Sequence, residues 1–176
     1  MNRENTPARW ADAIAARVGT YGNGPWLLEL GKWLGLAGKD WLPDSSGDER
    51  VTVPAPVRAI QIELCTLPSH GQAPPQSRLN HIVLDRVFFN GEMAAQRPHE
   101  AALPFGLDAK ENTPASVEAK LGHGASVLYR GKGEKAGIVS WELDDNRVVE
   151  VRFRTQAKGI GQVQIVRLMK AVQFGV

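Results

Sequence analysis

The glycine-rich segment at residues 131–137 is the first place where residue types suggest chemistry. Its sequence, Gly-Lys-Gly-Glu-Lys-Ala-Gly, has the glycines and lysines of a phosphate-binding loop. It lacks the Gly-x-x-x-x-Gly-Lys-Ser/Thr order, and it leads into a predicted strand instead of the helix N-terminus that holds a phosphate. We therefore interpret this segment as the charged tip of a β-hairpin.

The remaining residues with catalytic potential are scattered along the chain. The histidines stand in separate segments, at His70, His81, His99 and His123. None has the spacing of a zinc site, although His99 and Glu100 could orient each other. Cys65 follows a strand pattern, and we interpret it as a buried thiol because an unpaired cysteine usually packs as a small apolar residue. We expect no catalytic residue, cofactor or metal, and an enzyme using His81 or His99 is the weaker hypothesis.

Tryptophan and basic residues are better suited to contact with another macromolecule, because both Trp and Arg are enriched in protein interfaces. Trp10, Trp26 and Trp33 fit the apolar faces of predicted helices, so we assign them to the core. Trp41 lies in a loop and is predicted to be an exposed anchor. Basic residues of the C-terminal half could form a positive face, with a solvated sheet face as the alternative. The predicted partner-binding residues are Trp41, Arg130, Lys132, Lys135, Arg152 and Arg154.

The first half of the chain contains two predicted helices and two predicted strands. Thr6-Pro7 provides an N-cap and a first-turn proline, and the apolar residues that follow recur at helical spacing. A second helix is predicted near residues 26–36, where Gly31 indicates close packing or a weaker helix. Residues 42–56 have the composition of a loop. Residues 57–66 and 79–89 are predicted strands, the first with the alternation of one buried face.

The second half is predicted to contain one helix and four strands. Residues 90–112 are interpreted as a loop, and a helix begins at Thr113-Pro114 and ends at Gly122. The strands are predicted at residues 127–129, 138–143, 148–154 and 160–169. The order α-α-β-β-α-β-β-β-β favours an α+β fold with helices packed on one face of antiparallel sheets.

The two halves share a pattern of one helix followed by strands. Their matching apolar residues are Ile60 with Val149, Ile62 with Val151, and Leu64 with Phe153. We predict two related α-β-β units in tandem, one in residues 1–90 and one in residues 91–176, packed as one compact unit. The alternative is that such units recur by chance in an α+β fold.

Composition excludes several functional classes. The chain has 176 residues, with 21 basic and 19 acidic side chains, a balance too even for a strong nucleic-acid binder. One cysteine allows no internal disulfide. No apolar run approaches the roughly 20 residues that cross a bilayer, and the first residues lack the pattern of a signal peptide. We expect a cytoplasmic protein whose partner is neither nucleic acid nor membrane.

Several motifs in the second half carry a family resemblance. They are the Leu103-Pro104-Phe105-Gly106-Leu107 run, the Thr113-Pro114 helix ending in Leu121-Gly122, Trp141-Glu142-Leu143, and the alternating strands at 149–153 and 163–165. This pattern resembles bacterial immunity proteins of polymorphic-toxin and type VI secretion systems. The helix-then-sheet unit is also similar to the BamE-like fold of outer-membrane assembly lipoproteins, which carry a signal peptide and a lipidated cysteine.

The resemblance implies an immunity protein that binds and neutralises a cognate secreted toxin by occlusion, with no catalytic residues of its own. The alternative is a BamE-like adaptor of the cell envelope.

Overall fold

The protein combines helices with one antiparallel sheet. The computed structural model describes residues 6–20, 24–36, 38, 41–43, 50–66, 82–111, 113–122, 126–130, 137–145, 147–154 and 159–167. The helices are α1 (Pro7–Arg17), α2 (Gly24–Leu34), the 3-10 helix η2 (Pro56–Arg58), α3 (Gly91–Gln96) and α4 (Pro114–Leu121). The strands are β1 (Arg50–Ala55), β2 (Ile60–Thr66), β3 (Ile82–Asn90), β4 (Ser126–Arg130), β5 (Ile138–Asp144), β6 (Arg147–Phe153) and β7 (Ile160–Arg167).

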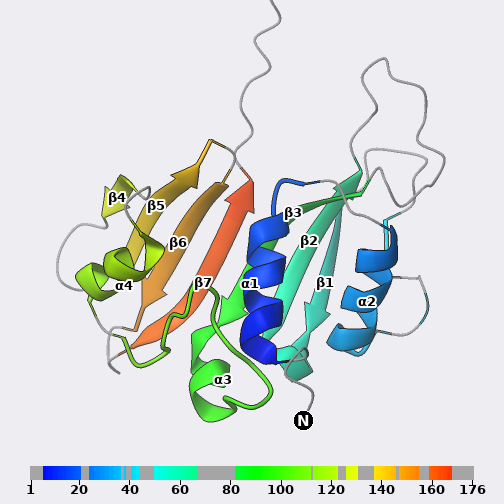
Figure 1. Ribbon diagram of the computed structural model, residues 1–176, viewed down its shortest axis with the longest axis horizontal. Coiled ribbons are helices and arrows are strands. Elements are labelled where there is room, and N and C mark those ends of the chain that lie inside the picture. The colour runs from blue at the N-terminus through cyan, green and yellow to red at the C-terminus, as the bar shows by residue number, and fades with distance from the viewer. Residues whose placement is uncertain are drawn as a thin grey trace, which may run out of the picture.

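The seven strands form a single sheet in the order β1-β2-β3-β7-β6-β5-β4 (Figure 1). Strands β1, β2 and β3 are consecutive antiparallel neighbours, as are β5, β6 and β7. The two sets meet where β3 pairs with β7, with Phe88 opposite Gln164. One sheet therefore runs without interruption through both halves of the chain.

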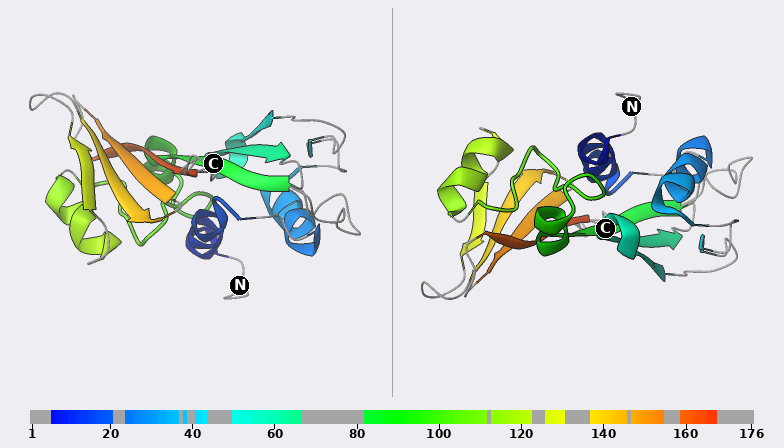
Figure 2. Two further views of the ribbon diagram at one scale, coloured as in Figure 1. Left: turned by 90° about the horizontal axis from the view of Figure 1, so that it is seen from above. Right: turned by 90° about the horizontal axis from the view of Figure 1, so that it is seen from below.

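Helices α1, α2 and α4 lie on the same face of this sheet (Figure 2). Helix α3 lies at one end of the sheet, where the backbone of Gly91 touches that of Ile160 in β7. The α+β class predicted from the sequence is confirmed. Among the described residues, no helix combines the length and apolar character needed to span a membrane.

Alternation along the strands directs one face of the sheet toward the helices. In β6, Val149 and Val151 have no exposed surface, whereas the next residue, Arg152, is exposed. In β7, Val163 and Ile165 are buried in the same way. Because successive strand side chains point to opposite faces, the residues between these positions form the face without covering helices.

Two helices begin as the sequence predicts. The Thr6 hydroxyl oxygen accepts a hydrogen bond from the Arg9 amide, and Thr113 does the same for Ser116. Proline follows each threonine, where its missing N–H has no helical partner to lose. These caps fix the first turns of α1 and α4.

The Leu-Pro-Phe-Gly-Leu segment connects α1 with α4. The Asp12 carboxylate of α1 accepts a hydrogen bond of 2.6 Å from the Phe105 amide. The Lys120 ammonium of α4 donates one of 2.7 Å to the Gly106 carbonyl. Leu103 and Leu107 are buried beneath. In this structure the motif positions helices over the sheet.

Three elements differ from the sequence prediction. Residues 50–55, predicted as loop because of their prolines, form the edge strand β1. An edge strand tolerates Pro54 because its missing N–H need not join a ladder. Residues 91–96, also predicted as loop, form α3, which is capped by the Asn90 side chain. The predicted strand at 57–66 begins only at Ile60, since η2 and Ala59 at φ 55° precede it.

Candidate functional site

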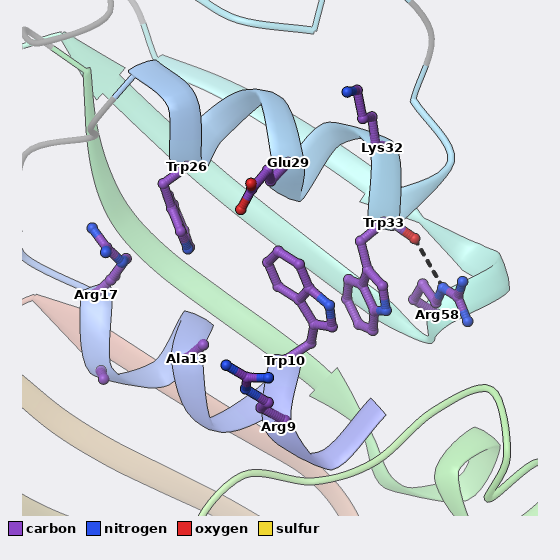
Figure 3. Close-up of a pocket in the computed structure, with 10 residues that line it drawn as sticks. Arg9, Trp10, Ala13, Arg17, Trp26, Glu29, Lys32, Trp33 and Arg58 are labelled. Atoms are coloured by element: carbon purple, nitrogen blue, oxygen red, sulfur yellow. Dashed lines mark hydrogen bonds between the residues drawn. The ribbon is translucent and has the colours of Figure 1, made fainter. Parts of the chain in front are cut away.

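An open groove of about 780 Å³ lies between α1 and α2, on the helix-covered side of the sheet (Figure 3). Helix α1 supplies Ala13 and Ala16 to the lining of the groove. The short alanine side chains leave space between the helices, which larger residues would fill. The groove is thus a consequence of the small residues on one edge of α1.

Basic and aromatic residues of α1 border this space. Arg9, Ala13 and Arg17 follow one another at intervals of four residues, so they share one edge of the helix. Trp10 stands beside Arg9 and is half-buried. The opposite face of α1, with Ile14 and Ala15 buried, packs toward the sheet.

Helix α2 forms the other wall. Trp26, Glu29 and Trp33 recur at intervals of three and four residues and therefore face the same side of the helix. Lys32 adds an exposed cation next to them. Leu27 and Leu30, on the remaining face, have no exposed surface and anchor α2 against the core.

The aromatic rings and the arginines are ordered by their own contacts. Trp10 and Trp33 stack with ring centroids 5.2 Å apart and planes 16° from parallel, and Figure 3 shows Trp33 between Trp10 and Arg58. The Arg58 guanidinium lies 4.9 Å from the Trp33 ring and donates a 2.9 Å hydrogen bond to the Trp33 carbonyl. Arg17 lies 4.7 Å from the Trp26 ring. Such cation–π contacts hold planar cations in fixed positions before any ligand arrives.

The groove is positively charged. The described lining has four basic residues, Arg9, Arg17, Lys32 and Arg58, and one acidic residue, Glu29. Glu29 points into the space between the helices, whereas the Lys32 side chain points away from α1 (Figure 3). Four cations against one anion leave a formal charge of +3 along the lining. Aromatic surface beside arginine is the composition of protein-interface hot spots. The described residues of the lining include no cysteine or histidine that could serve as a nucleophile or general base.

The structure does not bring the sequence-predicted binding residues together. Trp41 is 8% exposed and packs against Gly31 of α2, so the prediction of an exposed anchor is wrong. A loop residue is buried here because Gly31 has no side chain to keep the indole away. Lys132 and Lys135 lie outside the described residues. Arg130 ends β4, at the edge of the sheet far from α2 in strand order.

The two remaining predicted residues have different environments. Arg152 is exposed on the sheet face away from the helices. Arg154 is half-buried, and its guanidinium lies 3.5 Å from the Ala109 carbonyl, so it joins the strand end to a neighbouring loop. Neither belongs to the groove.

The sequence predicted that the three groove tryptophans belong to the core, and Trp33 is buried there. Trp10 and Trp26 are half-buried: they pack against the core and also border the groove. The available signal was the basic edge of α1, where Arg9 and Arg17 flank Ala13 at helical spacing. Arg58 gave no such signal, because its approach to Trp33 depends on the turn through η2.

The other reactive groups that the structure describes do not form a site, and His70, His81 and His123 lie outside the described residues. Cys65 is buried, and burial together with the nearby Asp85 charge raises the pKa of its thiol. His99 is exposed and lies 3.9 Å from Glu100. Within the part of the chain that the structure describes, no three acidic, histidine or cysteine side chains are grouped to hold a metal ion.

Comparison with known proteins adds no relative: no family model, no curated protein and no solved structure matches this chain.

Proposed function

We propose that this protein is an immunity protein, which binds a cognate secreted toxin and neutralises it by occlusion. The observation that carries the proposal is the groove between α1 and α2. Three tryptophans and four cations line it, and ring contacts hold Arg17 against Trp26, and Trp10 and Arg58 against Trp33. A surface of this composition suits tight binding without chemical conversion of what it binds.

Pre-organisation supports the same proposal. Arg17 and Arg58 are already stacked on indole rings, so little side-chain freedom is lost when a partner arrives. Ordering a long side chain at an interface costs about 0.5–1.5 kcal/mol, and stacking before binding reduces that cost. A protein that must inhibit a toxin at low concentration benefits from this saving.

The tandem relation of the two halves is part of the proposal. Strands β1-β2-β3 and β5-β6-β7 are two meanders joined at β3 and β7, and α2 and α4 precede them along the chain. This arrangement supports two related units that packed into one sheet. The groove belongs to the first unit, since α1, α2 and η2 all precede β2.

The test is coexpression with the protein encoded beside this chain. The neighbouring protein alone should arrest bacterial growth, and coexpression of this chain should restore growth and yield a stoichiometric complex. Growth arrest that this chain does not relieve, in the absence of any complex, would refute the proposal.

A groove variant locates the contact. Trp26→Ala should weaken the complex by at least about thirtyfold, the usual effect of a hot-spot tryptophan. Arg130, Lys132, Lys135 and Arg152 remain the competing location predicted from the sequence. Their conversion to glutamine separates the two locations, because only one set should reduce rescue.

A further inference from the structure

We propose that the groove between α1 and α2 receives an acidic segment of the partner polypeptide, whose carboxylates lie against Arg17 at one end and against Arg58 at the other. This inference rests on the proposed function, because it names the chemistry of the partner at the same site. It concerns a sequence feature of the partner and not its activity.

The charge of the groove requires a negatively charged occupant. The lining carries four cations and one carboxylate, whereas the whole chain has a formal charge of only +2. Positive charge is therefore concentrated in the groove relative to the rest of the molecule. Complementary charge across an interface speeds encounter and rejects wrong partners. Guanidinium groups also bind carboxylates in a planar, two-bond geometry.

A polypeptide fits the groove better than a single-stranded nucleic acid. Nucleic-acid grooves offer open aromatic faces on which bases stack. Here Trp33 lies between Trp10 and Arg58, so both faces of its ring are occupied, and Arg17 occupies one face of Trp26. Trp10 and Trp26 are half-buried, so part of each side chain is exposed for contact with apolar side chains.

Glu29 adds a second criterion for the occupant of the groove. Its carboxylate points between the helices, in the stretch between Trp26 and Trp10 (Figure 3). A uniformly negative occupant such as a phosphodiester chain meets repulsion at this point. An acidic segment that places a neutral or hydrogen-bond-donating group there does not. We therefore expect carboxylates separated by uncharged residues.

The test uses a fluorescein-labelled synthetic peptide of alternating glutamate and leucine, with anisotropy as the readout. The matched peptide has glutamine in place of glutamate. The acidic peptide should bind at least about fivefold more tightly, and its affinity should fall as salt rises from about 50 to 300 mM. Arg17→Gln should weaken binding about two- to fivefold, the range of an exposed charge pair.

Glu29→Gln should change the affinity for the acidic peptide in the opposite direction. Removing this carboxylate should tighten binding of the acidic peptide about two- to threefold, whereas a merely structural effect would weaken it. Lys110→Gln, which removes an exposed cation outside the groove, should leave affinity unchanged. Thermal unfolding of each variant confirms that it folds.

Three results would overturn the inference: equal binding of the two peptides or of neither, weaker binding by Glu29→Gln, or tighter binding of oligothymidylate than of the acidic peptide. The proposed function fails separately. If this chain rescues growth but its complex with the toxin is insensitive to salt and to Arg17→Gln, the immunity proposal stands and the acidic segment is wrong. If the peptides behave as expected and no toxin is neutralised, the acidic-segment inference stands and the immunity proposal is wrong.

Discussion

At the residue scale, Asp85 occupies a position that few carboxylates tolerate. Its side chain is 6% exposed and lies where the pairing of β2 with β3 shifts, since Glu63 pairs with Arg86 and Leu64 pairs with Leu84. Arg167 of β7 contacts it at 2.8 Å and Arg50 of β1 at 3.0 Å. One buried carboxylate thus links three strands across the bulge.

Replacement of Asp85 should destabilise the protein strongly. Asp85→Asn keeps the shape but leaves the mostly buried Arg167 without its carboxylate, and we expect a loss of about 2–4 kcal/mol in the free energy of unfolding. Arg50→Gln should cost less than about 1 kcal/mol, because the Arg50 side chain is 47% exposed. Urea unfolding measures both. Equal losses of unfolding free energy in the two variants would show that the Asp85–Arg167 pair contributes no more than the exposed Arg50 contact.

Cys65 should react slowly with thiol reagents. Burial raises the pKa of its thiol and Asp85 raises it further, while Arg167 and Arg50 act in the opposite direction. Because the thiolate is the reactive form, labelling of the native protein at neutral pH should be at least about tenfold slower than after unfolding. The raised pKa favours folding below the ordinary thiol pKa, and this contribution is lost as pH rises toward the folded value. Native labelling as fast as that of a model thiol would contradict this.

At the element scale, α2 is fixed from behind by the indole of Trp41. A Cβ atom on Gly31 would lie 2.7 Å from the Trp41 ring, which is closer than side chains pack. The same contact explains why this helix contains a glycine, and why Trp41 is unavailable to a partner.

Gly31→Ala should therefore destabilise the protein despite the better helix propensity of alanine. Overpacking costs about 1–3 kcal/mol, and alanine returns up to about 1 kcal/mol, so we expect a net loss near 1–2 kcal/mol. In a Trp41→Leu background the loss should shrink or change sign. Chemical denaturation of the four proteins in this cycle gives the coupling. Additive effects would mean that the two residues do not touch.

Sequence patterns predicted the elements whose signals are local. Helices α1 and α4 have a threonine cap followed by proline, and β2 and β6 have period-two alternation. Strand β1 was missed because Pro54 argues against a central strand, and only tertiary structure places it at the edge. Helix α3 was missed because six residues give too short a pattern.

The site was harder to predict for a physical reason. Trp10 and Trp33 lie on different helices, so their stacking depends on how α1 and α2 pack, which no local pattern encodes. An amphipathic stripe containing tryptophan also predicts core and interface equally well. Only the exposure of the tryptophan side chain distinguishes a core role from an interface role, and this exposure is known only from the structure.

At the scale of the whole molecule, one sheet spans both halves of the chain. We predict that they unfold together, because separating them would expose the β3–β7 junction with Val87 and Val163 at its centre. Tryptophan fluorescence and far-UV circular dichroism should give coincident urea transitions. Two separated transitions would show that residues 1–90 and 91–176 are independent domains.

The groove is the feature of the whole molecule on which the functional account depends. The most direct measurement is the dissociation constant of this protein for the proposed toxin partner, determined by calorimetry for the wild type, Trp26→Ala and Arg152→Gln. An interface in the groove predicts at least about thirtyfold weaker binding for Trp26→Ala. It predicts wild-type affinity for Arg152→Gln, which changes the opposite face of the sheet. Wild-type affinity for Trp26→Ala together with weakened binding for Arg152→Gln would contradict it and move the interface to the uncovered face.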